Sequence, residues 1–176
     1  MKYALALLYL VLSISCVKPR RLNNEITKVE LARGGAWSDY GATISIDSAL
    51  DFQYFGDHGG IRQGYFKGKV SHQLWDTLTQ KLEQIKYKAI SPTPETKVAD
   101  ANYFELIVYW KNSKKTISRA WHVRGDSVLN LLIWLDSRYK TLKLVQVNTP
   151  LKFETTDHGM SPSLKDVKFP PSNKNY

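Results

Sequence analysis

The sequence contains very little cysteine and few acidic residues. Its 176 residues include one cysteine, Cys16, so no disulfide can form within the chain and noncovalent packing must hold the fold. Only 16 Asp and Glu residues stand against 25 Lys and Arg, which gives a formal net charge of +9. The basic residues form no Arg-rich run interleaved with aromatic residues. We therefore interpret the charge as a solvated surface and expect no nucleic-acid partner.

The sequence also lacks the motifs of the common catalytic and metal sites. None of its four histidines lies in a His-Glu-x-x-His array, and no Gly-x-Ser-x-Gly elbow occurs. The run from Gly56 to Gly60 lacks the Gly-Lys-Ser/Thr ending of a phosphate loop. The sequence therefore predicts a protein that is not an enzyme and that uses no metal and no cofactor.

Alternation of apolar and polar residues predicts four strands in the first part of the chain. They fall at residues 27–31, 42–46, 50–54 and 61–70. Four such strands can form an antiparallel meander that buries one face under a helix, and this is the arrangement that we expect.

A helix is predicted directly after the fourth strand. Ser71 is suited to be its N-cap, and Val70 and Trp75 are spaced for a hydrophobic staple across the first turn. Apolar residues then recur at helical spacing as far as Ile85, which gives the helix one face to pack on the meander.

A hairpin and a second helix are predicted next. Residues 103–110 and 115–122 read as its two strands, and Asp126 or Ser127 as the cap of the helix. A short apolar run at 142–147 suits an edge strand.

The predicted fold is a single α+β domain spanning residues 26–147. It consists of an antiparallel four-strand meander and a helix, followed by a β-hairpin and a second helix. Pro, Lys, Asn and Ser dominate residues 148–176, which we expect to form a loosely ordered C-terminal tail.

The first residues have the anatomy of an export signal. Lys2 precedes an apolar run from Tyr3 to Leu12 that is too short to span a bilayer. Small residues then lead to Cys16, which resembles the lipobox of bacterial lipoproteins, where the chain is cut before the cysteine and the thiol carries a diacylglycerol. We predict a signal peptide at residues 1–15, lipidation of Cys16 and a tether at residues 16–25.

The resemblance to lipoprotein signals also implies a location. Val17, not aspartate, follows the cysteine, which favours the outer membrane with the domain facing the periplasm. The usual lipobox has leucine three residues before the cysteine, whereas this chain has Ser13 there. A plain signal peptide with an incidental cysteine is the alternative.

Several segments of the predicted domain resemble one family. They are Leu31–Gly35, Ile44–Asp47, Phe52–Gly56, Gly64–Phe66, Val70–Trp75, Asp100, Tyr103–Ile107 and Leu132–Leu135. In this order they resemble small bacterial lipoproteins classed as domain of unknown function 6438, over roughly residues 26–147. The resemblance implies the fold and the lipid anchor but no activity. Many family members carry two cysteines, the second followed by proline, before the second strand. This chain has Gly35 and Asp39 in place of the cysteines and Tyr40 in place of the proline. Any redox, metal-binding or disulfide role of that cysteine pair is therefore absent from this protein.

Two loops at one end of the meander form the predicted contact surface. The candidate binding residues are Trp37, Asp39 and Tyr40 on one loop and His58 and Arg62 on or beside the other. Neighbouring connections of a meander bring exposed aromatic and charged residues together, a mixture that suits recognition. In another interpretation, Trp37 packs back on the sheet as a lid.

The sequence thus predicts a noncatalytic, membrane-anchored envelope lipoprotein that binds an unknown envelope protein or glycan. An envelope enzyme that uses His58 with Asp39 or Asp57 is the alternative. A basic nucleic-acid binder is a third possibility, and it requires that residues 1–15 are not an export signal.

Overall fold

The computed structural model describes residues 25–35, 41–57, 62–92, 102–120 and 125–155. Within these ranges the chain forms seven strands, two α-helices and two short 3-10 helices. The strands are β1 (Ile26–Gly35), β2 (Ala42–Asp47), β3 (Asp51–Gly56), β4 (Gly64–Lys69), β5 (Asn102–Trp110), β6 (Ser113–Ala120) and β7 (Leu144–Val147). The helices are α2 (His72–Gln84), η1 (Tyr87–Ala89), α3 (Ser127–Asp136) and η2 (Arg138–Lys140).

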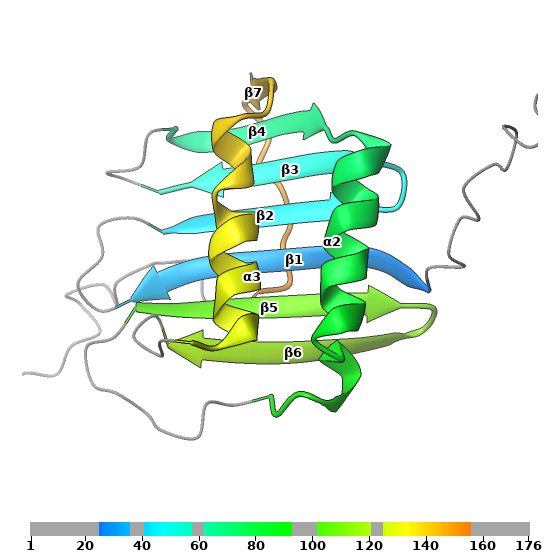
Figure 1. Ribbon diagram of the computed structural model, residues 1–176. Helices are drawn as coiled ribbons and strands as arrows, with labels where there is room; N and C mark the ends of the chain where they lie inside the picture. The colour runs from blue at the N-terminus through cyan, green and yellow to red at the C-terminus, as the bar shows by residue number, and fades with distance from the viewer. Residues whose placement is uncertain (1–24, 36–40, 58–61, 93–101, 121–124, 156–176) are drawn as a thin grey trace, which may run out of the picture.

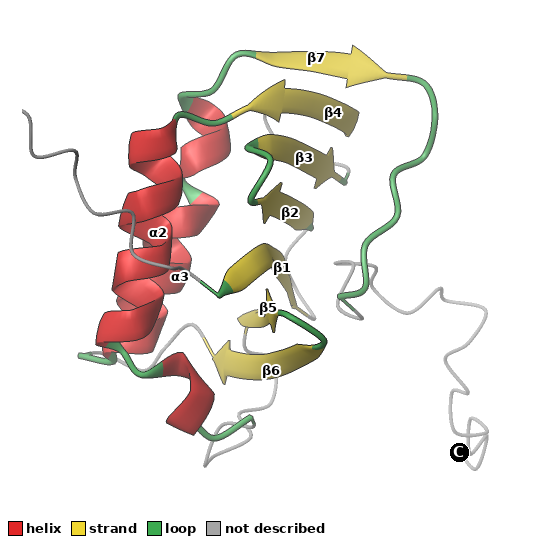
Figure 2. Ribbon diagram, turned by 90° about the vertical axis from the view of Figure 1, so that its right-hand side faces the viewer, coloured by secondary structure: helices red, strands yellow, loops and turns green. Residues whose placement is uncertain are grey.

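All seven strands belong to one sheet with the order β6-β5-β1-β2-β3-β4-β7. Every neighbouring pair is antiparallel. Both α-helices lie on one face of this sheet and run across its strands (Figures 1 and 2). The predicted α+β class is confirmed.

The predicted arrangement differs from the structure in detail, because the meander is not a separate unit. β1 is a central strand that pairs with β5 as well as with β2, and β7 continues the sheet beyond β4. The hairpin therefore occupies the edge of β1, whose backbone N–H and C=O groups would otherwise need other partners. The pairing of Trp110 with Ser113 also begins β6 two residues before the predicted position 115.

The core lies between the helices and the sheet. Alternate residues of the central strands point toward the helices, including Leu31, Ile44, Phe52 and Leu106, and each is at most 1% exposed. Burying a side chain of this size stabilises the fold by about 1.5–3 kcal/mol. The helices cover these residues with Leu78 and Leu82 of α2 and Val128, Leu129, Leu131, Leu132 and Leu135 of α3.

Side-chain caps fix where both helices begin. The Leu74 N–H donates to the Ser71 hydroxyl at 3.1 Å, as predicted, and Val70 and Trp75 are both buried in the core. The Val128 N–H donates to the Asp126 carboxylate at 2.8 Å, so Asp126 and not Ser127 caps α3.

The chain after β7 crosses the face of the sheet opposite the helices (Figure 2). We call residues 148–155 the strap. The Glu154 N–H donates to the Glu30 carboxylate at 2.7 Å, and Thr155 is 1% exposed. The first part of the predicted tail therefore lies against β1, and residues 156–176 lie outside the described ranges.

Candidate functional site

Four strands begin or end together at one end of the sheet, which we call the loop end (left in Figure 1). β1 and β3 end there, and β2 and β4 begin there. Ala42 pairs with Gly56, and the Asp57 N–H donates to the Gly41 carbonyl at 3.0 Å. Gly41, which leads into β2, and Asp57, which follows β3, therefore lie side by side, as the interpretation of the contact surface requires.

The predicted site residues divide into two groups in the structure. Arg62 and Asp57 lie at the loop end among the described residues. Trp37, Asp39, Tyr40 and His58 lie outside the described residues, as does the predicted lipidation site Cys16. Among the described residues, the candidate site therefore consists of Arg62 and the residues around it.

Arg62 takes part in two hydrogen bonds, one of them to a residue 80 positions away. Its Nη2 donates to the Leu142 carbonyl at 3.3 Å, and its own carbonyl accepts a bond from the Tyr54 hydroxyl at 3.4 Å. Its Nη1 is buried and has no hydrogen-bond partner among the described residues. A buried guanidinium nitrogen without an acceptor is unfavourable, so Arg62 has an unused donor at the loop end.

Gly56 permits the close approach of Arg62 to β3. A Cβ atom at position 56 would lie 2.0 Å from the Arg62 carbonyl oxygen and 2.6 Å from the Tyr54 hydroxyl. The nearer obstacle is backbone, which cannot rotate away. Only glycine therefore fits between β3 and the residue that carries the candidate contact.

The tyrosine that donates to the Arg62 carbonyl is stacked on a second tyrosine. The rings of Tyr54 and Tyr139 lie 4.6 Å apart at an angle of 19°, and both residues are buried. Burial raises the pKa of Tyr54 well above its usual value, and Tyr139 raises it further. Tyr54 therefore remains a neutral hydroxyl that donates to Arg62.

A salt bridge joins the loop end to α3. Arg33 Nη1 lies 2.9 Å from Asp136 Oδ2, and the side chains are 21% and 9% exposed. Burial raises the pKa of Asp136, an effect that the positive charges of Arg33 and Lys140 oppose. Arg33 and Asp136 satisfy each other, so Arg62 differs from Arg33 in having a nitrogen without an acceptor.

The sequence interpretation missed this salt bridge. It ended the first strand at residue 31, whereas β1 continues through Gly35. Arg33 continues the alternation of Val29 and Leu31, and all three point toward the helices. That alternation was the available signal, but the partner Asp136 lies 103 residues away.

A second polar cluster ties the strap to the sheet. Lys28 Nζ lies 2.8 Å from Glu30 Oε1, and the other carboxylate oxygen, Oε2, accepts the Glu154 N–H. Lys114 forms a salt bridge with Glu154 and lowers its pKa. Burial, Glu30 and Glu154 together raise the pKa of Tyr109. Because these groups hold two segments together, we assign the cluster a structural role.

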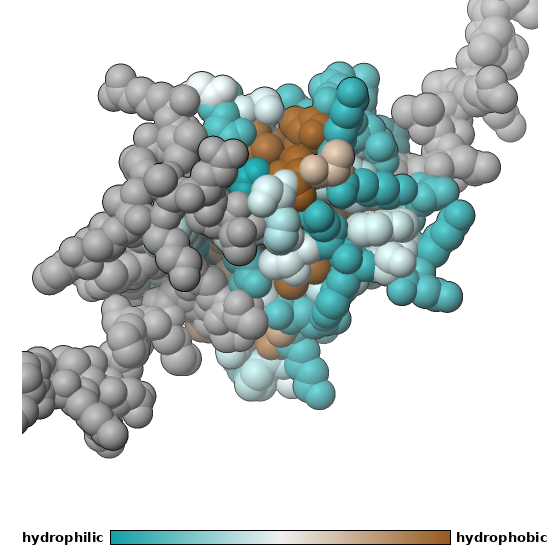
Figure 3. Space-filling model, turned by 90° about the horizontal axis from the view of Figure 1, so that it is seen from below, coloured by the Kyte–Doolittle hydropathy of each residue, from teal (hydrophilic) through white to brown (hydrophobic). Residues whose placement is uncertain are grey.

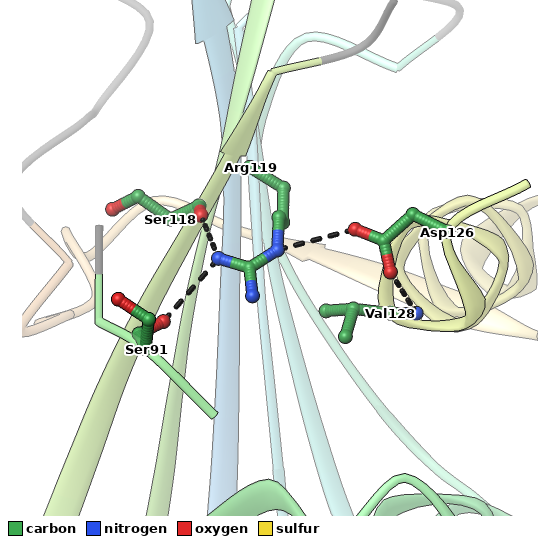
Figure 4. Close-up of polar contacts among 5 residues, drawn as sticks. All are labelled: Ser91, Ser118, Arg119, Asp126 and Val128. Carbon is green, nitrogen blue, oxygen red and sulfur yellow. Dashed lines mark hydrogen bonds and ion pairs between the residues drawn. The ribbon is translucent and has the colours of Figure 1, made fainter. Parts of the chain in front are cut away.

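A third cluster joins β6 to the start of α3 (Figure 4). Arg119 Nε donates to Asp126 at 3.2 Å, and Nη1 donates to the carbonyls of Ser118 and Ser91 at 2.7 and 3.3 Å. Asp126 is already the helix cap. The guanidinium therefore has acceptors within the fold, and this cluster is also structural.

No group of three or more His, Cys, Asp or Glu residues within the described ranges is placed to hold a metal ion. None of the described helices is long and apolar enough to cross a membrane. The chain matches no protein-family model and no curated protein sequence.

Proposed function

We propose that this protein is a noncatalytic envelope lipoprotein, anchored through Cys16 to the outer membrane and facing the periplasm, which binds another envelope component at its loop end. The observation that carries the binding proposal is the Nη1 of Arg62 at the loop end, which is buried and has no hydrogen-bond partner among the described residues. The resemblance of residues 26–147 to a lipoprotein family, with its order of meander, helix, hairpin and helix, supports the same proposal.

The charges around Arg62 favour an acceptor-rich partner. Arg33 and Asp136 cancel each other's charge, whereas the guanidinium of Arg62 has only a backbone carbonyl as acceptor among the described residues. A carboxylate or a carbonyl of a protein, or a hydroxyl or carboxylate of a glycan, supplies the acceptor that Nη1 lacks. Arginine fixed in this way is typical of residues that dominate binding energy at interfaces.

The anchor places this surface within reach of envelope components. Two acyl chains on Cys16 give stable attachment, because each buried methylene contributes about 0.8 kcal/mol. Residues 16–25 then connect the lipid to Ile26, the first residue of β1. A tethered domain binds neighbours at a raised effective concentration, so modest affinity at the loop end is sufficient.

Photocrosslinking in intact cells tests the proposal. A photoreactive residue at exposed Gln63, next to Arg62, should give a defined adduct, whereas one at exposed Gln80 on α2 should not. Arg62→Gln should remove the Gln63 adduct, and Arg62→Lys, which keeps the charge, should retain part of it. The matched control is Lys86→Gln, which removes one positive charge from an exposed position after α2.

Substituting Trp37, Asp39 and His58 together should also abolish the adduct, because the proposed surface includes both loops. An adduct pattern that is unchanged by Arg62→Gln and by the triple substitution contradicts the proposed surface. Circular dichroism of each variant separates loss of binding from loss of fold.

A further inference from the structure

The two edges of the sheet are protected to different degrees. On β6, the Ser118 N–H donates to the Pro92 carbonyl at 2.8 Å, and the Ser118 carbonyl accepts from Arg119 (Figure 4). Charged residues also lie along this strand, and the coloured part of the view from below shows mostly hydrophilic residues with smaller hydrophobic areas between them (Figure 3). The backbone of β6 is therefore partly occupied, and its side chains discourage pairing with another strand.

Within the part of the chain that the structure describes, β7 has none of these protections. It pairs only with β4, and its sequence Leu-Val-Gln-Val contains no charged residue and no proline. Val145 is 65% exposed, the larger of the two values among the exposed large hydrophobic residues of the described chain. Natural proteins usually cover such an edge or interrupt it with Lys or Pro, so β7 is suited to accept another strand.

Charges around β7 indicate the chemistry of that strand. Residues 137–153 contain Arg138, Lys140, Lys143 and Lys152 and no acidic residue. Lys67 of β4 lies directly across from Val145. A second copy of the chain at this edge would bring like positive charges together, and the undescribed segment 17–24 is itself basic, so neither is a favourable partner for β7. An acidic segment complements the positive charges.

We propose that β7 binds an extended acidic segment of a partner protein, which adds to the sheet as a further strand. Residues two apart along a strand lie on the same face. An antiparallel partner residue opposite Val145 therefore has, two positions further on, a residue opposite Lys143. The partner motif is a β-branched residue and an acidic residue separated by one position. This inference rests neither on the lipid anchor nor on Arg62.

Peptide binding to the full chain, purified in detergent, tests this inference. The probe is a labelled peptide Val-Thr-Val-Thr-Glu-Thr-Glu, and the matched control peptide has Lys in place of both Glu residues. Fluorescence anisotropy should show binding of the acidic peptide that weakens with salt, and hydrogen exchange should slow at residues 144–147. Lys143→Glu and Val145→Asp should each weaken binding about tenfold or more, since each change repels the acidic strand.

Lys115→Glu on β6 is the control variant and should leave binding unchanged. Both variant positions near β7 are exposed, so each protein is expected to fold, and circular dichroism verifies this. Equal binding of the acidic and basic peptides would overturn the inference. Exchange protection outside β7, or a dimer formed through β7 in the absence of peptide, would overturn it too.

Discussion

The salt bridge between Arg33 and Asp136 allows a quantitative test of how the loop end is held. We compare the wild type with Arg33→Met, Asp136→Leu and the double variant. Removing one partner leaves the other charge largely buried, because the side chains are only 21% and 9% exposed. Removing both leaves an apolar pair of similar volume between β1 and α3.

The magnitude follows from the distance and the burial. Two unit charges about 3 Å apart attract each other by about 6 kcal/mol at an effective dielectric constant of 20, and desolvation offsets most of this gain. We therefore expect Arg33→Met to lower the free energy of unfolding by about 2–3 kcal/mol. Asp136→Leu should cost about 1–2 kcal/mol, because Arg33 is the more exposed partner. The double variant should return to within about 1 kcal/mol of the wild type.

The pH dependence provides a second measurement on the same proteins. The pKa of Asp136 is raised from its usual 3.8, so the native state takes up this proton before the unfolded state does. Its contribution to the free energy of unfolding therefore grows as pH falls through the native pKa toward 3.8, and Asp136→Leu should remove that part of the profile.

Urea unfolding followed by circular dichroism gives the four free energies. A double variant whose loss equals the sum of the two single losses would refute the reasoning, because the two side chains would then be energetically independent.

Three further predictions concern the packing of the loop end, the strap and the core. Gly56→Ala should destabilise the domain by about 3 kcal/mol in urea unfolding, because the added Cβ would lie 2.0 Å from a backbone oxygen. Gly125→Ala is the control: its Cβ meets nothing within 4 Å, so it should cost only about 1 kcal/mol for the positive φ. Equal losses of stability in the two variants would contradict this prediction. Glu30→Gln should speed hydrogen exchange at the Glu154 amide and cost about 1–2 kcal/mol, whereas Glu25→Gln, at an exposed partner of Lys88 and Lys111, should leave the stability unchanged. Unchanged exchange at the Glu154 amide would contradict the strap contact. Burial raises the pKa of Tyr87 to about 12, so its contribution to the free energy of unfolding is complete below pH 10 and is lost as pH rises to 12, by at most about 3 kcal/mol. Tyr87→Phe should remove this alkaline loss without weakening the protein at pH 7, since the hydroxyl has no partner among the described residues. A Tyr87→Phe protein that loses stability with pH as steeply as the wild type would contradict this prediction.

Local signals in the sequence predict the helices well. Ser71 and Val70 predict the start of α2, because the N-cap and the hydrophobic staple depend only on residues within about one turn of each other. The start of α3 was left open between Asp126 and Ser127, because both residue types cap helices and only the geometry of the Val128 N–H decides between them. β2 was predicted with an error of one residue for the same reason, since alternation is local.

Long-range pairing accounts for what the sequence did not predict. The position of β1 at the centre of the sheet depends on β5, which lies about 75 residues away, and no local pattern encodes that partner. The strap likewise depends on contacts of Glu154 with Glu30 and Lys114, which lie 124 and 40 residues away in the sequence. At the candidate site, alternation alone places Arg62 near the neighbouring loop, but its bond to Leu142 and its unused nitrogen required the structure.

The proposed anchor is the premise of the envelope function, and one measurement tests it most directly. Cells that express the wild type or Cys16→Ala are labelled with a fatty acid, and their membranes are separated from the soluble fraction. The account predicts that the wild type carries the label and stays with the membrane, and that Cys16→Ala loses both. Label and membrane retention that do not depend on Cys16 would contradict the lipoprotein assignment.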